Sequence, residues 1–130
     1  MAAKTVSEIM NAKLLYIGER DRVALARRYI LKFGITAVPV LDDEHRPVGI
    51  VSLRDLDRDG DELQPSSPVS TVKDTDTVEE AARKLAETDF HHLVVIDDKG
   101  VAVGMVSAVD FLRALLGIAP RHPKAFDDAP

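Results

Sequence analysis

Gly49–Leu56, GIVSLRDL, and Gly104–Phe111, GMVSAVDF, are two versions of one phrase in this chain. Each has a glycine, two apolar residues, a serine, and an aspartate three residues after the serine. Placing residues 14–60 over residues 69–115 without a gap gives thirteen identities in forty-seven positions. Average residue usage would give about three by chance. The chain therefore contains an internal duplication with an offset of 55 residues.

Each copy predicts a helix ahead of its phrase. Apolar residues recur at helical spacing in residues 22–33 and again in residues 77–87. Asp21 and Asp76 stand just before these segments and are expected to be their N-caps. Gly34 is expected to end the first helix.

The segments around these helices predict strands. Two runs rich in β-branched residues follow each helix and are joined by a short acidic turn, which is typical of a hairpin. A short apolar piece precedes each helix, and helical segments are expected to restart at residues 55–57 and 110–116. The expected strands are residues 14–17, 35–41 and 47–53 in the first copy and 69–72, 90–96 and 101–106 in the second. The predicted fold class is α+β, with two pseudo-symmetric β-α-β-β-α repeats.

The duplication also sets the expected domain boundaries. Repeat 1 is predicted at residues 1–60 and repeat 2 at residues 61–117, with a linker rich in proline and serine at 57–68. Residues 118–130 contain three prolines and are expected to be a poorly ordered tail. Because neither half of a 130-residue chain could bury much apolar surface alone, the repeats are expected to pack together.

Composition argues against several classes of function. A net charge of −5 disfavours nucleic acid and anionic membrane as partners. There is no cysteine, and the four histidines lack the spacing of a zinc site, so no metal is expected. No signal peptide or membrane-spanning segment is recognisable, which predicts a cytoplasmic protein. No phosphate loop, dinucleotide fingerprint or serine elbow occurs, so no catalytic residue and no enzymatic activity are expected.

The Ser-x-x-Asp step has two interpretations. In the first, Ser52 and Ser107 are helix N-caps, and Asp55 and Asp110 return the bond as in a capping box. In the second, the helix N-terminus and the serine hydroxyl bind a phosphate, while the aspartate accepts the hydroxyls of a ribose. The first interpretation is the commoner one for a single motif, and the duplication favours the second.

The helix, the strand Ile35–Val40 and the repeated Gly-apolar-apolar-Ser-x-x-Asp phrase together resemble a tandem pair of cystathionine β-synthase (CBS) domains, or Bateman module. The resemblance extends from Thr5 to Leu116. It implies that both repeats fold into one pseudo-twofold CBS-pair module. It also implies that an adenosine-containing ligand, namely AMP, ADP, ATP or S-adenosylmethionine, binds in the cleft between the repeats without any required cofactor.

The resemblance assigns expected roles to particular residues. Asp55 and Asp110 would hold the ribose, and Ser52 and Ser107 would contact phosphate or ribose. Arg54 is a further candidate phosphate partner. The adenine would lie against Thr36, Ala37, Val38 and Pro39 in the first copy, and against His91, His92, Leu93 and Val94 in the second.

The two copies differ where the ligand is expected. Val94 replaces Pro39, and the segment Val6–Met10 has no clear twin before Val69. Since adjacent strand residues point to opposite faces, only one of His91 and His92 can face the ligand. We therefore expect at most one site to bind tightly.

The predicted function is regulatory, with ligand occupancy transmitted to an unidentified partner protein. The resemblance also suggests a homodimer, paired through residues 22–33, 77–87 and 110–116. The alternative is a non-catalytic dimerisation or protein-interaction scaffold with vestigial clefts. In that case Ser52, Asp55, Ser107 and Asp110 serve only as caps.

Overall fold

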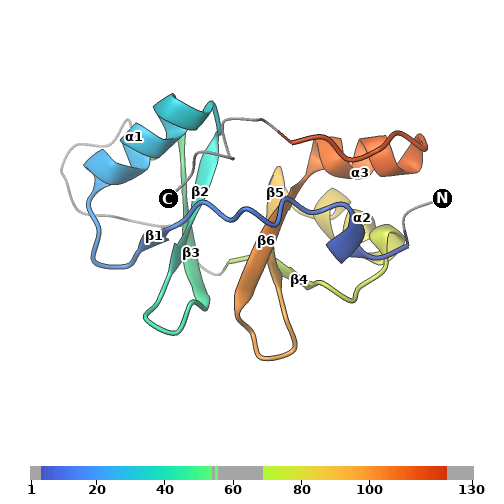
Figure 1. Cartoon of the computed structure of the whole chain (residues 1–130), viewed down its shortest axis with the longest axis horizontal. Helices are drawn as coiled ribbons and strands as arrows, with labels where there is room; N and C mark the ends of the chain where they lie inside the picture. The colour runs from blue at the N-terminus through green and yellow to red at the C-terminus, as the bar shows by residue number, and fades with distance from the viewer. Residues whose placement is uncertain (1–3, 54, 56–68, 123–130) are drawn as a thin grey trace. The chain divides into compact units, whose positions relative to one another are not determined.

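The computed structural model describes residues 4–53, 55 and 69–122. The described residues form two compact units, drawn in Figure 1. One unit contains the described residues from Leu15 to Val69. The other combines the N-terminal segment, up to Leu14, with Ser70–His122. The expected linker at 57–68 and the tail beyond His122 lie outside the described residues.

The first unit is a three-stranded sheet with one described α-helix. Its elements are β1 (Ile17–Gly18), α1 (Val23–Phe33), β2 (Ala37–Leu41) and β3 (Pro47–Ser52). The strand order is β1-β2-β3, with β1 parallel to β2 and β2 antiparallel to β3. The predicted helix and hairpin are therefore confirmed, with ends shifted by one or two residues.

The second unit repeats this topology and adds a further helix. It contains β4 (Thr71–Lys73), α2 (Val78–Ala86), β5 (His92–Ile96), β6 (Ala102–Ser107) and α3 (Ala108–Leu115). The order is β4-β5-β6, again with one parallel and one antiparallel pair. The hairpin register shifts between Val40 and Leu41 in the first unit and between Val95 and Ile96 in the second, which are matched positions. The predicted α+β class with two similar repeats is confirmed, the register shift is a further likeness that the sequence did not predict, and the helix expected at 55–57 lies largely outside the described residues.

The helix starts differ from the sequence prediction. Asp21 and Asp76 are not the N-caps, which are Arg22 and Thr77. Instead, Asp21 Oδ2 accepts the backbone N–H of Gly18 at 2.6 Å, and Asp76 Oδ2 accepts that of Lys73 at 2.9 Å. Both carboxylates therefore close the turn that carries the chain from the first strand into the helix.

Each unit has its own apolar core on the helical side of its sheet. In the first unit, Ala26 and Ile30 of α1 pack with Ile17, Val38, Val40 and Val51 of the strands. In the second, Val78, Ala81 and Leu85 of α2 pack with Phe111 and Ala114 of α3, and with Val72, Leu93, Val95 and Val106 from the strands. The alternation of buried and half-buried residues along β3 and β6 aims every second side chain at these cores.

The N-terminal segment completes the core of the second repeat. Val6 and Ile9, which are 0% and 2% exposed, belong to the same apolar cluster as α2 and α3. Backbone hydrogen bonds fix the segment: Val6 N donates to Asp76 O at 2.9 Å, and Val78 N donates to Lys4 O at 3.1 Å. In Figure 1 this is the blue chain running beside β6 to α2.

A short 3₁₀ helix, η1 (Val6–Glu8), shapes this segment. Glu8 Oε2 accepts the backbone N–H groups of Thr5 and Lys4, each at 2.7 Å. These bonds, that from Thr5 first, lower the pKa of Glu8 below its ordinary value. The ionised carboxylate thereby holds the turn that presents Val6 and Ile9 to the core.

Candidate functional site

The two Ser-x-x-Asp junctions have nearly the same geometry. At the end of β3, Asp55 Oδ2 accepts Ser52 N at 2.7 Å and Ser52 Oγ at 3.0 Å. At the start of α3, Asp110 Oδ2 accepts Ser107 N at 2.8 Å and Ser107 Oγ at 3.1 Å. The capping bonds that the sequence predicts are therefore present. They use one carboxylate oxygen, so the cap does not by itself exclude a ligand role.

The second junction is the more enclosed one. Asp110 is buried, with 8% of its surface exposed, whereas Asp55 is half-buried. Asp110 N also donates to Ser107 Oγ at 3.3 Å, which completes the capping box. The other carboxylate oxygen, Oδ1, lies 4.0 Å from Arg113 Nη1 and 3.9 Å from His122 Nδ1. Asp110 therefore presents a carboxylate to two basic side chains.

Backbone hydrogen bonds tie each junction to the strand expected beside the adenine. Leu53 N donates to Thr36 O at 2.9 Å, and Ala108 N donates to His91 O at 3.0 Å. The β-sheet register places Ser52 opposite Ala37 and Ser107 opposite His92. In each repeat, the folding of the hairpin thus brings the serine beside the first two residues of the expected adenine segment.

Exposure divides that segment in the same way in both repeats. Thr36 and His91 are exposed, and Ala37 and His92 are half-buried. Val38 and Leu93 are completely buried in the two apolar cores. Pro39 and Val94 are buried as well. Side-chain contact with a ligand is therefore open to the first two positions of each segment, whereas Arg54 lies outside the described residues.

His92 lies opposite Ser107 at the second junction, and the fold changes the pKa of its imidazole. Burial lowers the pKa of His92 below its ordinary value of 6.5, and the neighbouring His91 lowers the pKa further. Asp110 acts in the opposite direction and raises the pKa of His92. The net result favours a neutral imidazole beside Ser107, which can donate or accept a hydrogen bond.

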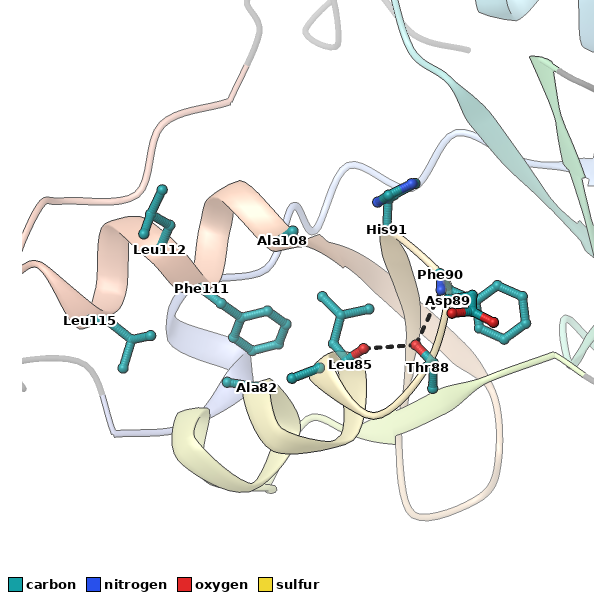
Figure 2. Close-up of a pocket in the computed structure, with 11 residues that line it drawn as sticks. Ala82, Leu85, Thr88, Asp89, Phe90, His91, Ala108, Phe111, Leu112 and Leu115 are labelled. Atoms are coloured by element: carbon teal, nitrogen blue, oxygen red, sulfur yellow. Dashed lines mark hydrogen bonds between the residues drawn. The ribbon is translucent and has the colours of Figure 1, made fainter.

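An apolar groove lies between α2 and α3, and its lining includes His91 and Ala108 (Figure 2). Its volume is about 530 Å³, and Leu85 of α2 and Phe111 of α3 point toward one another across it. Leu112 and Leu115, at its edge, are 56% and 55% exposed. Thr88 closes one end, since its hydroxyl donates to Leu85 O at 2.8 Å and accepts Phe90 N at 3.2 Å.

The described part of the chain offers neither a metal site nor a membrane span. No group of three or more histidine, aspartate or glutamate residues in residues 4–53, 55 and 69–122 could hold a metal ion. Within the same residues, every helix is too short or too polar to cross a bilayer.

The two repeats share one β-α-β-β topology, with a serine and an aspartate at matched junctions. The family model of the CBS domain matches residues 6–59 and again residues 61–117. The chain therefore belongs to the CBS domain family, as a tandem pair.

Two curated proteins contain a segment similar to this chain. The chain is 30% identical over 122 residues to a homoserine O-acetyltransferase of Methanosphaerula palustris, and the match covers 88% of the chain but only 24% of that enzyme. It is 29% identical to an uncharacterized 17.7 kDa protein of Acidianus ambivalens, over 91% of the chain and 76% of that protein. The chain thus spans about a quarter of the enzyme it matches.

Among solved structures, the complex of CBSX2, a CBS-pair protein of Arabidopsis thaliana, with AMP is similar to this chain. The identity is 29%, the TM-score is 0.74, and the match covers 87% of this chain and 96% of the other. The likeness thus extends over nearly the whole length of both chains.

Two features of the second junction escape the sequence analysis. His122 lies in the segment expected to be a disordered tail, yet its ring reaches Asp110 Oδ1 and Met10 O. The backbone of Asn11 pairs with Met105 of β6, so the N-terminal segment borders the same strand. The His122–Met10 and Asn11–Met105 contacts leave no local sequence signal, because each joins residues about a hundred positions apart, and no periodic pattern predicts the shorter-range contact of His122 with Asp110.

Proposed function

We infer that this chain is a regulatory module that binds an adenosine-containing ligand, with AMP as the first candidate. The observation that carries the proposal is the matched pair of carboxylates, Asp55 and Asp110, each held by its serine beside the half-buried start of a strand. A carboxylate so fixed is suited to accept both hydroxyls of a ribose. The AMP complex of CBSX2, a protein similar over nearly its whole length, supports AMP as the ligand.

The capping bonds do not compete with this role. At Asp110 they use Oδ2, and Oδ1 is directed toward Arg113 and His122. Because Ala108 N already donates to His91 O and Asp110 N to Ser107 Oγ, the proposal places the ribose at this junction and assigns no phosphate contact to these two N–H groups. Regulation then requires that the ligand favour one arrangement of the module over another.

Calorimetric titration of the whole chain with AMP, ATP and S-adenosylmethionine tests the proposal. We expect AMP to bind and to raise the melting temperature, because a ligand that binds only the folded state stabilises it. Asp55→Asn and Asp110→Asn keep the size of the side chain and remove its charge, and each should weaken AMP binding at its own repeat by about tenfold or more. Asp98→Asn, in the exposed turn between β5 and β6, is the matched control. Absence of heat and of a melting shift with all three ligands at millimolar concentration would overturn the proposal.

The alternative, an interaction scaffold, is favoured by the groove between α2 and α3. Exposed apolar side chains surround it, among them Phe90 at 47% and Leu115 at 55% exposure. A second copy of the chain would bury this surface, so the proposal includes a homodimer formed through these helices. Its partner protein stays unidentified, and a cytoplasmic location stays a prediction.

Sedimentation equilibrium tests the dimer. Leu115→Asp should shift the chain from dimer to monomer, because a charge would be buried in an apolar contact. Tyr16→Asp, at a 37% exposed side chain in the first repeat, should leave the mass unchanged. A wild-type chain that sediments as a monomer at high concentration would contradict the homodimer. A dimer without any ligand binding would favour the scaffold.

A further inference from the structure

The chain reverses direction directly after α3. Gly117 has φ +72°, and its N–H donates to Ala114 O at 3.2 Å. Ile118 N then donates to Arg113 O at 2.8 Å. This pair of bonds around a left-handed glycine is a Schellman motif, which turns the chain back along the helix. The residues that follow therefore run toward the start of α3, as the red segment in Figure 1 shows.

The returning segment is held at the second Ser-x-x-Asp junction. Arg113 Nη1 donates to the backbone carbonyl of Arg121 at 3.2 Å. The His122 ring lies with Nε2 3.1 Å from Met10 O and with Nδ1 3.9 Å from Asp110 Oδ1. His122 thus joins the N-terminal segment to the motif carboxylate. We name residues 118–122 the C-terminal strap.

The strap occupies the side of Asp110 that a ligand would need. The serine bonds use Oδ2, and His122 stands against Oδ1. Only 8% of Asp110 is exposed. The His122 ring, with Nδ1 3.9 Å from Oδ1, stands on the approach to this oxygen atom of a carboxylate that is already largely buried, so a ribose hydroxyl that binds Oδ1 would compete with the ring.

We propose that the C-terminal strap is an autoinhibitory contact, in which His122 competes with the ligand for Asp110. The proposal rests on the function inferred above. Ligand binding at the second repeat then releases the strap. The released strap signals to a partner that the site is occupied. The same competition makes the second repeat the weaker of the two sites.

The competition is measured in the Asp55→Asn background, in which AMP binding at the first repeat is weakened and calorimetry with AMP reports chiefly the second repeat. Adding His122→Ala should tighten AMP binding by about three- to tenfold, because the fraction of molecules with an accessible Asp110 rises. A chain ending at Pro120 should show the same gain. His45→Asn is the control. It removes a histidine from the first repeat at a position with φ 62°, where asparagine is tolerated, and it should leave the AMP affinity unchanged.

A second measurement follows the strap itself. In the nuclear magnetic resonance spectrum, the ring signals of His122 should move toward the values of an unfolded peptide as AMP saturates the second repeat. Equal AMP affinity with and without His122, or unchanged ring signals at saturation, would overturn the autoinhibitory contact. If the wild-type chain binds AMP and Asp55→Asn abolishes that binding both with and without His122, the autoinhibitory contact is also overturned. The proposed site in the first repeat would then still stand. Failure of the wild-type chain to bind AMP would overturn the proposed function as well.

Discussion

The two repeats share a topology and a motif, but they reach their stability by different means. The second repeat takes Val6 and Ile9 from the N-terminal segment into its core and is bordered by the C-terminal strap. Among the described residues, the apolar cluster of the first repeat is formed by residues from Ile17 to Val51. The two repeats therefore share the local pattern, and the segments at 4–14 and 118–122 contact the second one.

The largest expected effect comes from removing the N-terminal contribution. Ile9→Ala should lower the free energy of unfolding by about 2–5 kcal/mol, because it leaves a cavity among buried side chains. Hydrogen exchange should show faster opening of α2, β5 and β6, and less change in α1 and β2. Leu31→Ala, at a position 73% exposed, is the control. An equal increase of exchange in both repeats would contradict the assignment of Ile9 to the second.

The next effect concerns the glycine of the repeated phrase. A Cβ at Gly104 would lie 2.7 Å from Met10 Sδ and 2.9 Å from the backbone oxygen of Asn11. Gly104→Ala should therefore cost about 1–3 kcal/mol in chemical denaturation, because the N-terminal segment must shift away from β6.

Gly18→Ala is the control for that change, since its Cβ would meet only the Asp21 side chain, at 3.3 Å. A similar loss of stability at both glycines would show that the close approach of the N-terminal segment is not the reason for a glycine at position 104.

A smaller effect is expected at the start of α2. Thr77 Oγ1 accepts Glu80 N at 3.1 Å, whereas Arg22, the matched residue of the first repeat, makes no side-chain capping bond. Thr77→Ala should cost about 1 kcal/mol, and Thr77→Ser, which keeps the hydroxyl, much less. Thermal unfolding of the three chains would measure this. Equal losses for alanine and serine would indicate that packing, and not the cap, matters there.

The smallest effect is a pH dependence that the first repeat lacks, because Ala37 stands at the position matched to His92. Burial lowers the pKa of His92 in the folded state, so the unfolded chain takes up the proton first. The stability linked to His92 is fully present above its ordinary pKa of 6.5 and is lost as the pH falls below that value.

Urea unfolding at several pH values, compared with His92→Ala, would isolate this term. The wild-type chain should lose more stability than the variant on acidification. A wild-type chain that gains stability relative to His92→Ala below pH 6.5 would show that the sign is wrong.

The sequence predicted the elements because their signals are local. Helical spacing located α1 and α2, β-branched runs located both hairpins, and Ser107 with Asp110 predicted the capping box that starts α3. The N-caps were wrong, since Asp21 and Asp76 each lie one residue too early and bind the turn before the helix. The sequence pattern cannot distinguish an aspartate that closes a turn from one that caps a helix, because both stand just before a helical segment.

The candidate site was predicted only in part. The repeated phrase predicted the hydrogen bonds between Ser52 and Asp55 and between Ser107 and Asp110, which the structure contains, and their role in binding a ligand stays a prediction. The sequence did not predict which residues of the adjoining strand are exposed. Thr36 and His91 are accessible, whereas Val38 and Leu93 are buried in the cores. Which face of a strand meets a helix depends on the packing of the whole sheet, so the pattern of a short apolar run cannot assign it.

By itself, the sequence determined that this protein is a tandem repeat of one β-α-β-β unit with a serine and a carboxylate at each junction. Periodicity and self-similarity are properties of neighbouring residues, and a duplication preserves them. The tertiary structure alone decided that Val6 and Ile9 belong to the second repeat, and that His122 lies against Asp110. The first depends on burial and backbone pairing between distant segments, and the second depends on the path of the chain after Gly117, which the sequence pattern does not specify.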